Sequence, residues 1–533
     1  MGRIFVASHS GSMIGALVSR GKARGIGFAG LVSVGNEIDL SIGEICAATL
    51  DDPMVDAYLL FLETIRNSDS LRSFALAAAE RGKSILAYKL GRSMAAAELA
   101  MTHTGALAGE DDVADAFLKD CGIARVETLD AALEGLALLR RMPANPAAGR
   151  RPRVGVVTTT AGGAAMVVDQ LGIRNIAVEP PTEATLARLA EAGVDVAPAR
   201  IVDLTLAGTR YLVVKSALDV LLTAPEFDLI VAVPGSSARF EPQRVVRPLI
   251  DCAASRKPLA AFVVPDAPEA LAQLTAAGIP NFRTPESCAD SIAAAFARRT
   301  PRPLPARATA FTAGAGRLLD ELEAYELLDR RGIPHAPAMA VPVDSESPPT
   351  LGFPYPVAVK ILSPHIAHKT EAGGVVLGVT DDRGLHRAIA RIRANVIKNL
   401  PETDVRRVLV QQMVRGVGEV LVGYRRDAEV GPIVILAAGG VLAEIYRDRA
   451  LRLAPVGFDT AHDMIAEVKT LRALYGYRGQ PAGDRDALAS AIVALSQFAV
   501  LDDPRVAEAE INPLLVLEEG FGVIAVDALV RLA

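Results

Sequence analysis

Several classes of protein are excluded by what this 533-residue sequence lacks. Its apolar runs, such as PLAAFVV at 258–264, stop at proline, glycine or a charge, well short of the ~20 residues that cross a bilayer. The N-terminal MGRIFVASHSGS does not have the charged-then-apolar layout of a signal peptide. We therefore predict neither a membrane protein nor a secreted one, and the cytoplasm is the expected location.

Cysteine is scarce, and no charge of one sign dominates. Cys46, Cys121, Cys252 and Cys288 lie far apart and form no CxxC pair, which predicts buried thiols in a reducing compartment. The net charge is −6, so a nucleic acid is not an expected partner. An anionic ligand must then be held by local devices, namely helix N-termini, backbone amides and single lysines.

Two linker-like stretches divide the sequence into three blocks. They are RRMPANPAAGRRPR at 140–153 and RRTPRPLPARAT at 298–309, both rich in proline and arginine and without apolar periodicity. A chain of this length suits about three domains. The predicted domains cover residues 1–142, 151–300 and 309–533.

The first two blocks alternate strand and helix patterns. RIFVAS, AYLLFLE and SILAYKL are typical of strands in the first block, and RVGVVTT, DLIVAVP and LAAFVVP in the second. In the second block each strand is followed by a glycine- or proline-containing turn and then a helix. This rhythm predicts two doubly wound parallel sheets, whose sites lie at the carboxyl ends of the strands.

The third block has a different order of predicted helices and strands. It opens with the amphipathic helix LLDELEAYELLDRRG. The segments that follow are predicted to be antiparallel strands at 355–362, 374–379, 405–414, 419–427 and 432–440. Two more strands around a glycine turn are expected at 507–530.

A strand-to-helix turn opens each of the first two blocks. The turns lie in ASHSGSMIG and VVTTTAGGAA, and their small residues are Ser10, Gly11, Ser12, Thr160, Gly162 and Gly163. Amide donors and the positive end of a helix dipole make such a turn an anion site. A simple N-cap uses the same residue types, so both interpretations stay open for each turn alone. As a pair, the turns could face one phosphate from opposite sides.

His103 stands among small residues in MTHTGALAGEDD. A neutral imidazole can attack a phosphoryl group and carry it, and small neighbours would let its loop move. The other interpretation is an ordinary polar loop that caps a helix. Glu63, at the end of AYLLFLE, is a candidate to orient the ring, with a solvated strand-end glutamate as the alternative.

The third block carries signs of a nucleotide site. Lys360 ends an apolar strand, where a lysine is costly to bury unless it meets an anion such as a nucleotide phosphate. The segment SPHIAHKTEAGG follows and could form a loop over phosphates. Farther along, Glu510, Asn512 and Asp527 fall on strands predicted to be neighbours, and such oxygen ligands suit Mg²⁺ bridged to phosphates. Together these features predict ATP binding.

These motifs resemble the NDP-forming acyl-CoA synthetases, the superfamily of succinyl-CoA synthetase and ADP-forming acetyl-CoA synthetase, over essentially the whole chain. HTGALAG (103–109) resembles the phosphohistidine loop and SHSGS (8–12) the SxSG turn of the ligase domain. LLFLETI (59–65) resembles the strand whose glutamate supports the histidine, and TAGGAA (160–165) the second phosphate-facing helix start. The implied fold is α/β, with two flavodoxin-like doubly wound parallel-sheet domains followed by an ATP-grasp domain.

The resemblance also implies roles for individual residues. His103 carries the phosphoryl group, Glu63 supports it at one site and Glu510 at the other, and His368 matches a histidine of the phosphoryl relay in the acetyl-CoA branch. VLVQQMV matches the adenine hinge. The implied nucleotide contacts are Lys360, Lys369, Thr370, Gln411, Met413 and Glu419, and the implied magnesium ligands are Asn512 and Asp527.

The implied reaction is reversible: acyl-CoA, phosphate and ADP give a carboxylic acid, CoA and ATP through an acyl phosphate and a phosphohistidine on His103. It uses Mg²⁺, ATP or ADP, and CoA, and a homo- or hetero-oligomer is expected. Movement of the histidine loop between two sites would explain the small residues after the histidine. The alternative is a non-catalytic nucleotide-binding or regulatory subunit that needs a separate CoA-binding partner.

The sequence departs from the family pattern in three places. Relatives usually begin with a CoA-binding Rossmann domain, and this sequence begins just after the point where that domain would end, so we expect either a separate CoA-binding subunit or a truncated start. Thr160 stands where many relatives have asparagine, and RIVD (200–203) where they often have NPVD. The identity of the acyl group is left open.

Overall fold

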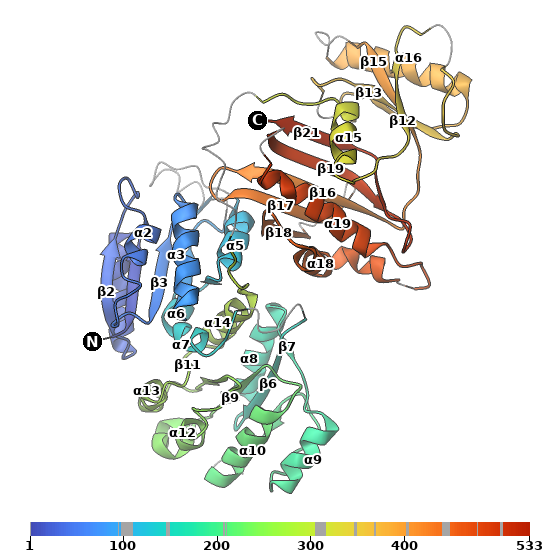
Figure 1. Cartoon of the computed structure of the whole chain (residues 1–533). Helices are drawn as coiled ribbons and strands as arrows, with labels where there is room; N and C mark the ends of the chain where they lie inside the picture. The colour runs from blue at the N-terminus through green and yellow to red at the C-terminus, as the bar shows by residue number, and fades with distance from the viewer. Residues whose placement is uncertain are drawn as a thin grey trace. The chain divides into compact units, whose positions relative to one another are not determined.

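The computed structural model divides the chain into two compact units, Met1–Pro303 and Leu304–Ala533 (Figure 1). The described residues are all except 1, 94, 97–109, 145–149, 206–207, 209, 304–315, 346–348, 367–368, 401–404, 440–447, 477 and 502–504. His103 and His368 therefore lie outside the described residues. No helix in the described part is long and apolar enough to cross a membrane.

The first sheet of the N-terminal unit is parallel, with the strand order β2-β1-β3-β4-β5. This is the flavodoxin-like order, as expected. The strands are β1 (Ile4–Ser8), β2 (Phe28–Ser33), β3 (Ala57–Leu62), β4 (Ser84–Lys89) and β5 (Ala124–Val126). The helices are α1 (Gly11–Ala23), α2 (Ile42–Ala47), α3 (Ser68–Glu80), α5 (Asp111–Asp120), α6 (Leu129–Glu134) and α7 (Leu136–Leu139). All six residues of β3 are buried, as befits a strand covered on both faces.

The second sheet repeats the same order, with one extra short strand. It runs β11-β10-β9-β6-β7, and β8 also pairs with β6. The strands are β6 (Arg153–Thr158), β7 (Ala177–Val178), β8 (Val202–Asp203), β9 (Leu229–Val233), β10 (Leu259–Phe262) and β11 (Asn281–Phe282). The helices are α8 (Ala161–Ile173), α9 (Glu183–Glu191), α10 (Tyr211–Thr223), α11 (Ser237–Phe240), α12 (Pro242–Ile250), α13 (Pro268–Ala276) and α14 (Pro285–Ala297).

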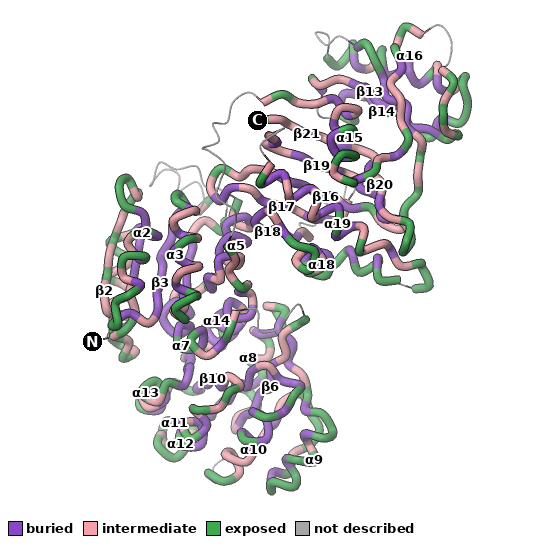
Figure 2. The backbone as a smooth tube through the Cα atoms, viewed as in Figure 1, coloured by how far each residue is buried: buried purple, intermediate pink, exposed green. Residues whose placement is uncertain are grey.

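Helix α14 belongs to the cores of both sheets. It packs on α8 of the second sheet and on α6 and β5 of the first. Ten of its 13 residues are buried, and Figure 2 shows most of the helix coloured as buried. Its apolar residues Cys288, Ile292 and Phe296 share one hydrophobic cluster with Leu86 of the first sheet and Val156 of the second. The two sheets therefore form one continuous core.

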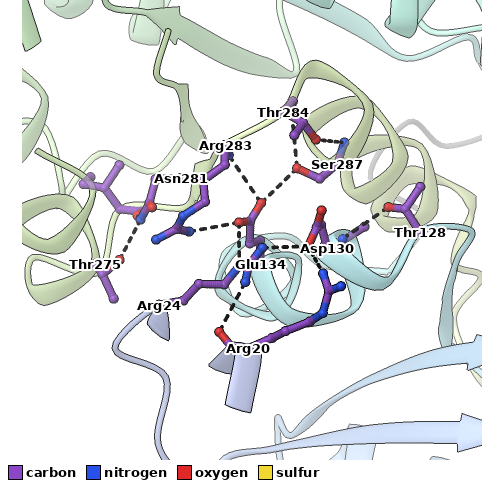
Figure 3. A network of polar contacts seen from close by, with 12 residues as sticks. Arg20, Arg24, Thr128, Asp130, Glu134, Thr275, Asn281, Arg283, Thr284 and Ser287 are labelled. Atoms are coloured by element: carbon purple, nitrogen blue, oxygen red, sulfur yellow. Dashed lines mark hydrogen bonds and ion pairs between the residues drawn. The ribbon is translucent and has the colours of Figure 1, made fainter. Parts of the chain in front are cut away.

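Buried carboxylates reinforce this junction. Asp290 of α14 accepts hydrogen bonds from the backbone amides of Glu127 and Thr128, at 2.9 and 2.8 Å, where the first sheet ends. Glu134 forms a second set of contacts, drawn in Figure 3. Its carboxylate accepts from Arg24 Nε (3.1 Å), Arg283 Nη1 (2.9 Å) and Ser287 Oγ (2.8 Å).

The C-terminal unit contains two antiparallel sheets. The first has the order β12-β15-β13-β14, and the second has the order β18-β17-β16-β19-β20, with β21 also paired to β19. The strands are β12 (Ala338–Pro342), β13 (Val357–Leu362), β14 (Val375–Val379), β15 (Arg407–Gln412), β16 (Gly418–Asp427), β17 (Gly431–Ala438), β18 (Arg449–Leu453), β19 (Val506–Val516), β20 (Val523–Ala525) and β21 (Ala528–Leu532). The helices are α15 (Glu321–Asp329), α16 (Asp382–Asn399), α18 (Phe458–Glu467), α19 (Arg485–Ser496) and the 3₁₀ helices η2 (Lys469–Tyr475) and η3 (Gln497–Ala499).

The end of the chain corrects one prediction. We expected two strands at 507–530, but three are present, because β20 and β21 are separated at Val526 and Asp527. Opposite this break lies Pro513, which has no N–H to continue the ladder. The register continues across the break, since the Asn512 amide donates to the Asp527 carbonyl and the Val526 amide to the Pro513 carbonyl, both at 3.2 Å. Asp527 therefore lies opposite Asn512, although it is not inside a strand.

The four cysteines confirm the expectation of buried thiols. Cys46, Cys121, Cys252 and Cys288 are all free and buried. Burial raises the pKa of each thiol, that of Cys252 to about 11. Because only the thiolate is a good nucleophile, burial disfavours reaction of these side chains.

Candidate functional site

The two predicted anion-binding turns have the same build. In the first, Ser8 Oγ donates to the Ser10 carbonyl at 2.7 Å and accepts from the Ser10 amide at 3.0 Å. In the second, Thr158 Oγ1 makes the same two bonds to Thr160, both at 2.9 Å. Each turn ends a buried parallel strand and begins a 13-residue helix, α1 or α8. The same hydrogen-bonded strand-to-helix turn therefore occurs twice, once in each parallel sheet.

The helix N-termini at these turns are not capped by side chains. Neither Ser10 nor Thr160 accepts a hydrogen bond from a helix amide through its side chain. By contrast, Thr182, Thr284 and Asp320 cap α9, α14 and α15 in the usual way. Among the described residues, no side chain accepts from the amides at the start of α1 or α8, which suits an external anion. The sequence left a simple N-cap open, and the side chains of Ser10 and Thr160 do not form one.

The predicted glycines play different parts. A Cβ on Gly162 would meet nothing within 4 Å, and one on Gly11 would meet only Ser33 Oγ, at 3.5 Å. A Cβ on Gly163 would lie 2.5 Å from Cγ1 of Val264. Gly11 and Gly162 therefore leave open space beside the helix starts, whereas Gly163 is required for packing.

A matched pair of alanine variants should separate these two roles. We expect Gly163→Ala to lower the free energy of unfolding by about 1–3 kcal/mol, because the new methyl group overpacks a closed contact. Gly162→Ala should leave it unchanged or raise it by up to about 1 kcal/mol, since alanine favours the helix and has room. Urea denaturation followed by circular dichroism would measure both, and equal destabilisation would contradict the assignment.

His9, which the sequence did not single out as a site residue, fixes the backbone beside the first turn. Its ring is buried, and Nδ1 accepts a 2.9 Å hydrogen bond from the Glu63 amide. The ring proton therefore sits on Nε2, which faces Glu37 Oε1 at 3.2 Å. Burial opposes ionisation of Glu37, but hydrogen bonds from His9 and the Ile42 amide lower its pKa. The only available signal was the position of this histidine within SHSGS.

Glu63 follows β3 directly and is buried, with 7% of its surface exposed. Its position at the carboxyl end of a central parallel strand is the one predicted. Because His103 lies outside the described residues, the support of the histidine by Glu63 stays a prediction.

The predicted lysines of the C-terminal unit meet at a carboxylate that the sequence did not single out. The side chain of Glu321 is fully buried, and its Oε1 accepts from Lys360 Nζ at 2.7 Å and from the Tyr325 hydroxyl at 2.6 Å. Lys369 Nζ lies 2.8 Å from Oε2 of the same carboxylate. Lys360 also donates to the carbonyl of Val526, beside Asp527.

The start of α15 explains the position of Glu321. Asp320 caps the helix and Glu323 completes a capping box, so these two acids serve the helix end. Glu321 and Tyr325 are one helical turn apart and share the buried face. Acids are common in the first turn of any helix, which is why the sequence alone did not single this one out.

Asp527 completes a cluster of four charges. Its Oδ1 accepts a 2.7 Å hydrogen bond from Lys369. Burial opposes the charge on Lys369, but the carboxylates of Glu321 and Asp527 raise its pKa to about 12. Burial likewise opposes ionisation of Glu321, but the two lysines lower its pKa. The structure therefore brings Lys360, Lys369 and Asp527 together around Glu321.

The predicted magnesium ligands lie beside this cluster. Asn512 is opposite Asp527, and its Nδ2 lies 3.4 Å from Glu510 Oε1 on the same face of β19. Within the described ranges, no three His, Cys, Asp or Glu side chains form a ready metal site. The donors here are carboxylate and amide oxygens, the type that Mg²⁺ takes together with phosphate oxygens. The residues present therefore fit a magnesium ion bound jointly with a nucleotide.

The remaining predicted nucleotide contacts are more scattered. Gln411 is buried and donates to the Tyr325 hydroxyl at 3.0 Å, so its side chain supports the Glu321 cluster. The Met413 amide donates to the Pro356 carbonyl at 3.0 Å. Thr370, Met413 and Glu419 are exposed. Their contacts with a nucleotide stay predictions.

Comparison with known proteins agrees with this architecture. Residues 1–139 match the succinyl-CoA ligase like flavodoxin domain, and residues 310–532 match an ATP-grasp domain. An ADP-forming acetate–CoA ligase I of Archaeoglobus fulgidus is 28% identical, over 98% of this chain and 77% of its own length. An ADP-forming 4-hydroxybutyrate–CoA ligase of Nitrosopumilus maritimus is 28% identical, over 100% of this chain and 78% of its own length.

A third relative is a separate subunit. The β subunit of ADP-forming acetate–CoA ligase I of Pyrococcus furiosus is 37% identical over 90% of its length, which corresponds to 40% of this chain. The two flavodoxin-ordered sheets, the ATP-grasp region and these matches lead to one conclusion: the chain belongs to the NDP-forming acyl-CoA synthetases, the family of the ADP-forming acetate–CoA ligases.

Proposed function

We propose that the chain is an acid–thiol ligase of the ADP-forming type, which interconverts acyl-CoA, phosphate and ADP with a carboxylic acid, CoA and ATP. The observation that carries this proposal is the pair of uncapped helix N-termini, α1 and α8, in a member of this family. Amide donors without a fixed counter-charge suit a phosphoryl group that must arrive and leave again.

The first half of the proposed reaction takes place at these two turns. A phosphate oxygen attacks the thioester carbonyl, the C–S bond breaks, and CoA leaves as a thiolate that takes up a proton. A ring nitrogen of His103 then attacks the phosphorus of the acyl phosphate, the P–O bond breaks, and the carboxylate leaves. The amides at Ser10–Ser12 and Thr160–Gly163 stabilise the transferred phosphoryl group, while Glu63 orients the ring.

The second half takes place in the C-terminal unit. The loop 103–109 carries the phosphoryl group there, and Glu510 replaces Glu63 as the orienting carboxylate. A β-phosphate oxygen of ADP attacks the phosphorus, and the P–N bond breaks with assistance from His368. Lys360 and Lys369 neutralise the phosphates. Asn512 and Asp527 would hold Mg²⁺, which supplies further neutralisation of the phosphate charge.

We also propose a cytoplasmic enzyme that assembles as a homo- or hetero-oligomer, with CoA bound in part by a separate subunit. Two observations support this. Relatives from Pyrococcus furiosus are named as α and β subunits. All four cysteines are free, as is usual in a reducing compartment.

The test is phosphorylation of the intact chain with γ-labelled ATP and Mg²⁺ in the absence of CoA. We expect an acid-labile, base-stable label on the wild type that disappears in His103→Asn. The matched control is His386→Asn, which changes a histidine on α16 and should keep the label. Folded wild-type protein that takes up no label, or a His103→Asn variant that keeps it, would refute the phosphohistidine mechanism and favour a non-catalytic nucleotide-binding subunit.

A further inference from the structure

The carboxylate of Asp527 already has a cation beside it. Lys369 Nζ donates to Asp527 Oδ1 at 2.7 Å and lies 2.8 Å from Glu321 Oε2 on its other side. The contact with Glu321 is an ion pair, and the hydrogen bond to Asp527 lies on the other side of the ammonium. Lys369 therefore bridges a buried carboxylate and a predicted magnesium ligand.

The two carboxylates differ in how firmly they are held. The side chain of Glu321 is 0% exposed and is fixed by Lys360 and Tyr325, whereas that of Asp527 is 36% exposed. Among the described residues, the only side chain within ion-pair distance of Asp527 is Lys369. A metal ion can thus approach Asp527 from solvent, but it must compete there with the ammonium, because two cations on one carboxylate repel each other.

The side chains of the cluster balance one another's formal charges. Two lysines face two carboxylates, so a divalent ion added alone would leave excess positive charge in a partly buried site. Phosphates entering with the ion would restore the balance. The flexible lysine stem and its three donors allow the ammonium to turn from Asp527 to a phosphate oxygen without losing Glu321.

We propose that Lys369 is the counter-cation of Asp527: its ammonium pairs with this carboxylate before a nucleotide binds, and a divalent cation replaces the ammonium there only when nucleotide phosphates bind the lysine. Glu321 is the positioning residue that retains Lys369 in both states. This inference rests on the proposed function only in taking Asp527 as a metal ligand. Its consequence is that metal and nucleotide bind with positive coupling, each weakly without the other.

The test measures Mn²⁺ binding to the full chain without nucleotide, by electron paramagnetic resonance of the free ion. Wild type should bind weakly, and Lys369→Gln should bind about tenfold more tightly, a typical size for coupling between two ligands. Lys369→Arg keeps the charge and should bind as weakly as wild type. Lys369→Gln/Asp527→Asn should lose this gain in Mn²⁺ affinity, which would show that the carboxylate of Asp527 is the ligand that Lys369→Gln makes available.

A second variant controls for misfolding that an unbalanced buried charge could cause. Lys369→Gln alone leaves Glu321 with one lysine. Glu321→Gln/Lys369→Gln keeps the buried charges balanced and frees Asp527 in the same way, so it should also bind Mn²⁺ more tightly than wild type. The inference is overturned if folded Lys369→Gln and the balanced double variant bind Mn²⁺ no more tightly than wild type, or if the gain persists with Asp527→Asn. Because His103→Asn should bind Mn²⁺ like wild type, a failure here is distinct from a failure to label His103.

Discussion

Replacement of Glu321 by alanine should lower the free energy of unfolding of the C-terminal unit by about 3–5 kcal/mol, the usual cost of removing one partner from a buried ion pair. The change leaves Lys360 and Lys369 without the carboxylate they share, and it removes the acceptor of the Tyr325 hydroxyl. The lysines are only 7% and 11% exposed, so water replaces the lost partner poorly. Urea denaturation followed by far-UV circular dichroism would measure the loss.

The control lies on the same helix. Glu326 is exposed, and its replacement by alanine should change the stability by no more than about 0.5 kcal/mol. If Glu326→Ala and Glu321→Ala were equally destabilising, the effect would come from the helix as a whole and not from the buried cluster.

The pH dependence offers a second check on the same residue. The folded-state pKa of Glu321 is lowered, so its contribution to stability is present above the ordinary pKa of a glutamate and is lost as the pH falls through the folded value. The pKa of Lys369 is raised to about 12, so its contribution is present below the ordinary pKa of a lysine and is lost as the pH rises through about 12. Glu321→Gln should therefore be less stable than wild type at neutral pH, and the difference should shrink in acid.

Replacement of Glu134 by alanine should destabilise the N-terminal unit by about 3 kcal/mol. The side chain of Glu134 is 2% exposed and binds Arg24, Arg283 and Ser287, which come from both parallel-sheet domains. Its loss removes the carboxylate that accepts from Arg283 Nη1 at the junction, while Arg24 keeps Asp130 and Ser287 keeps the Thr284 carbonyl (Figure 3). Because α14 belongs to both cores, the two sheets should unfold in one transition at a lower urea midpoint.

Asp130 provides the comparison for Glu134. It also pairs with Arg24, at 2.6 Å, but its side chain is 32% exposed. Asp130→Ala should therefore cost less than about 1 kcal/mol, as partly exposed ion pairs usually do. Similar losses in both variants would show that the buried position of Glu134 is unimportant.

The sequence predicted those parts of the fold that depend on local pattern. The apolar strands β1, β3, β4, β6, β9 and β10 and the helix starts after Ser10 and Thr160 could be located, because strand runs and turn residues are local signals. Strands β7 and β11 have two residues each, too few for any periodicity. The break at Val526–Asp527 was missed because its cause, Pro513, lies in the opposite strand.

The residues that organise the site were missed for a different reason. Glu321 meets Lys360, which is 39 residues away, and His9 meets the amide of Glu63, which is 54 residues away. No local pattern reports such a pairing. A lysine on a buried strand did signal that an anion must be near, but the sequence suggested a nucleotide phosphate and not a carboxylate of the protein itself.

The placement of α14 has a consequence for the order in which the N-terminal unit can be completed. Asp290 of α14 binds the backbone of Glu127, 163 residues earlier. The first sheet is therefore not fully covered until α14, at the end of the second sheet's sequence, has been synthesised. At roughly 5–20 residues per second, that interval is about 10–30 s on the ribosome. We therefore expect the first sheet, when expressed by itself, to expose the apolar surface that α14 covers in the whole chain.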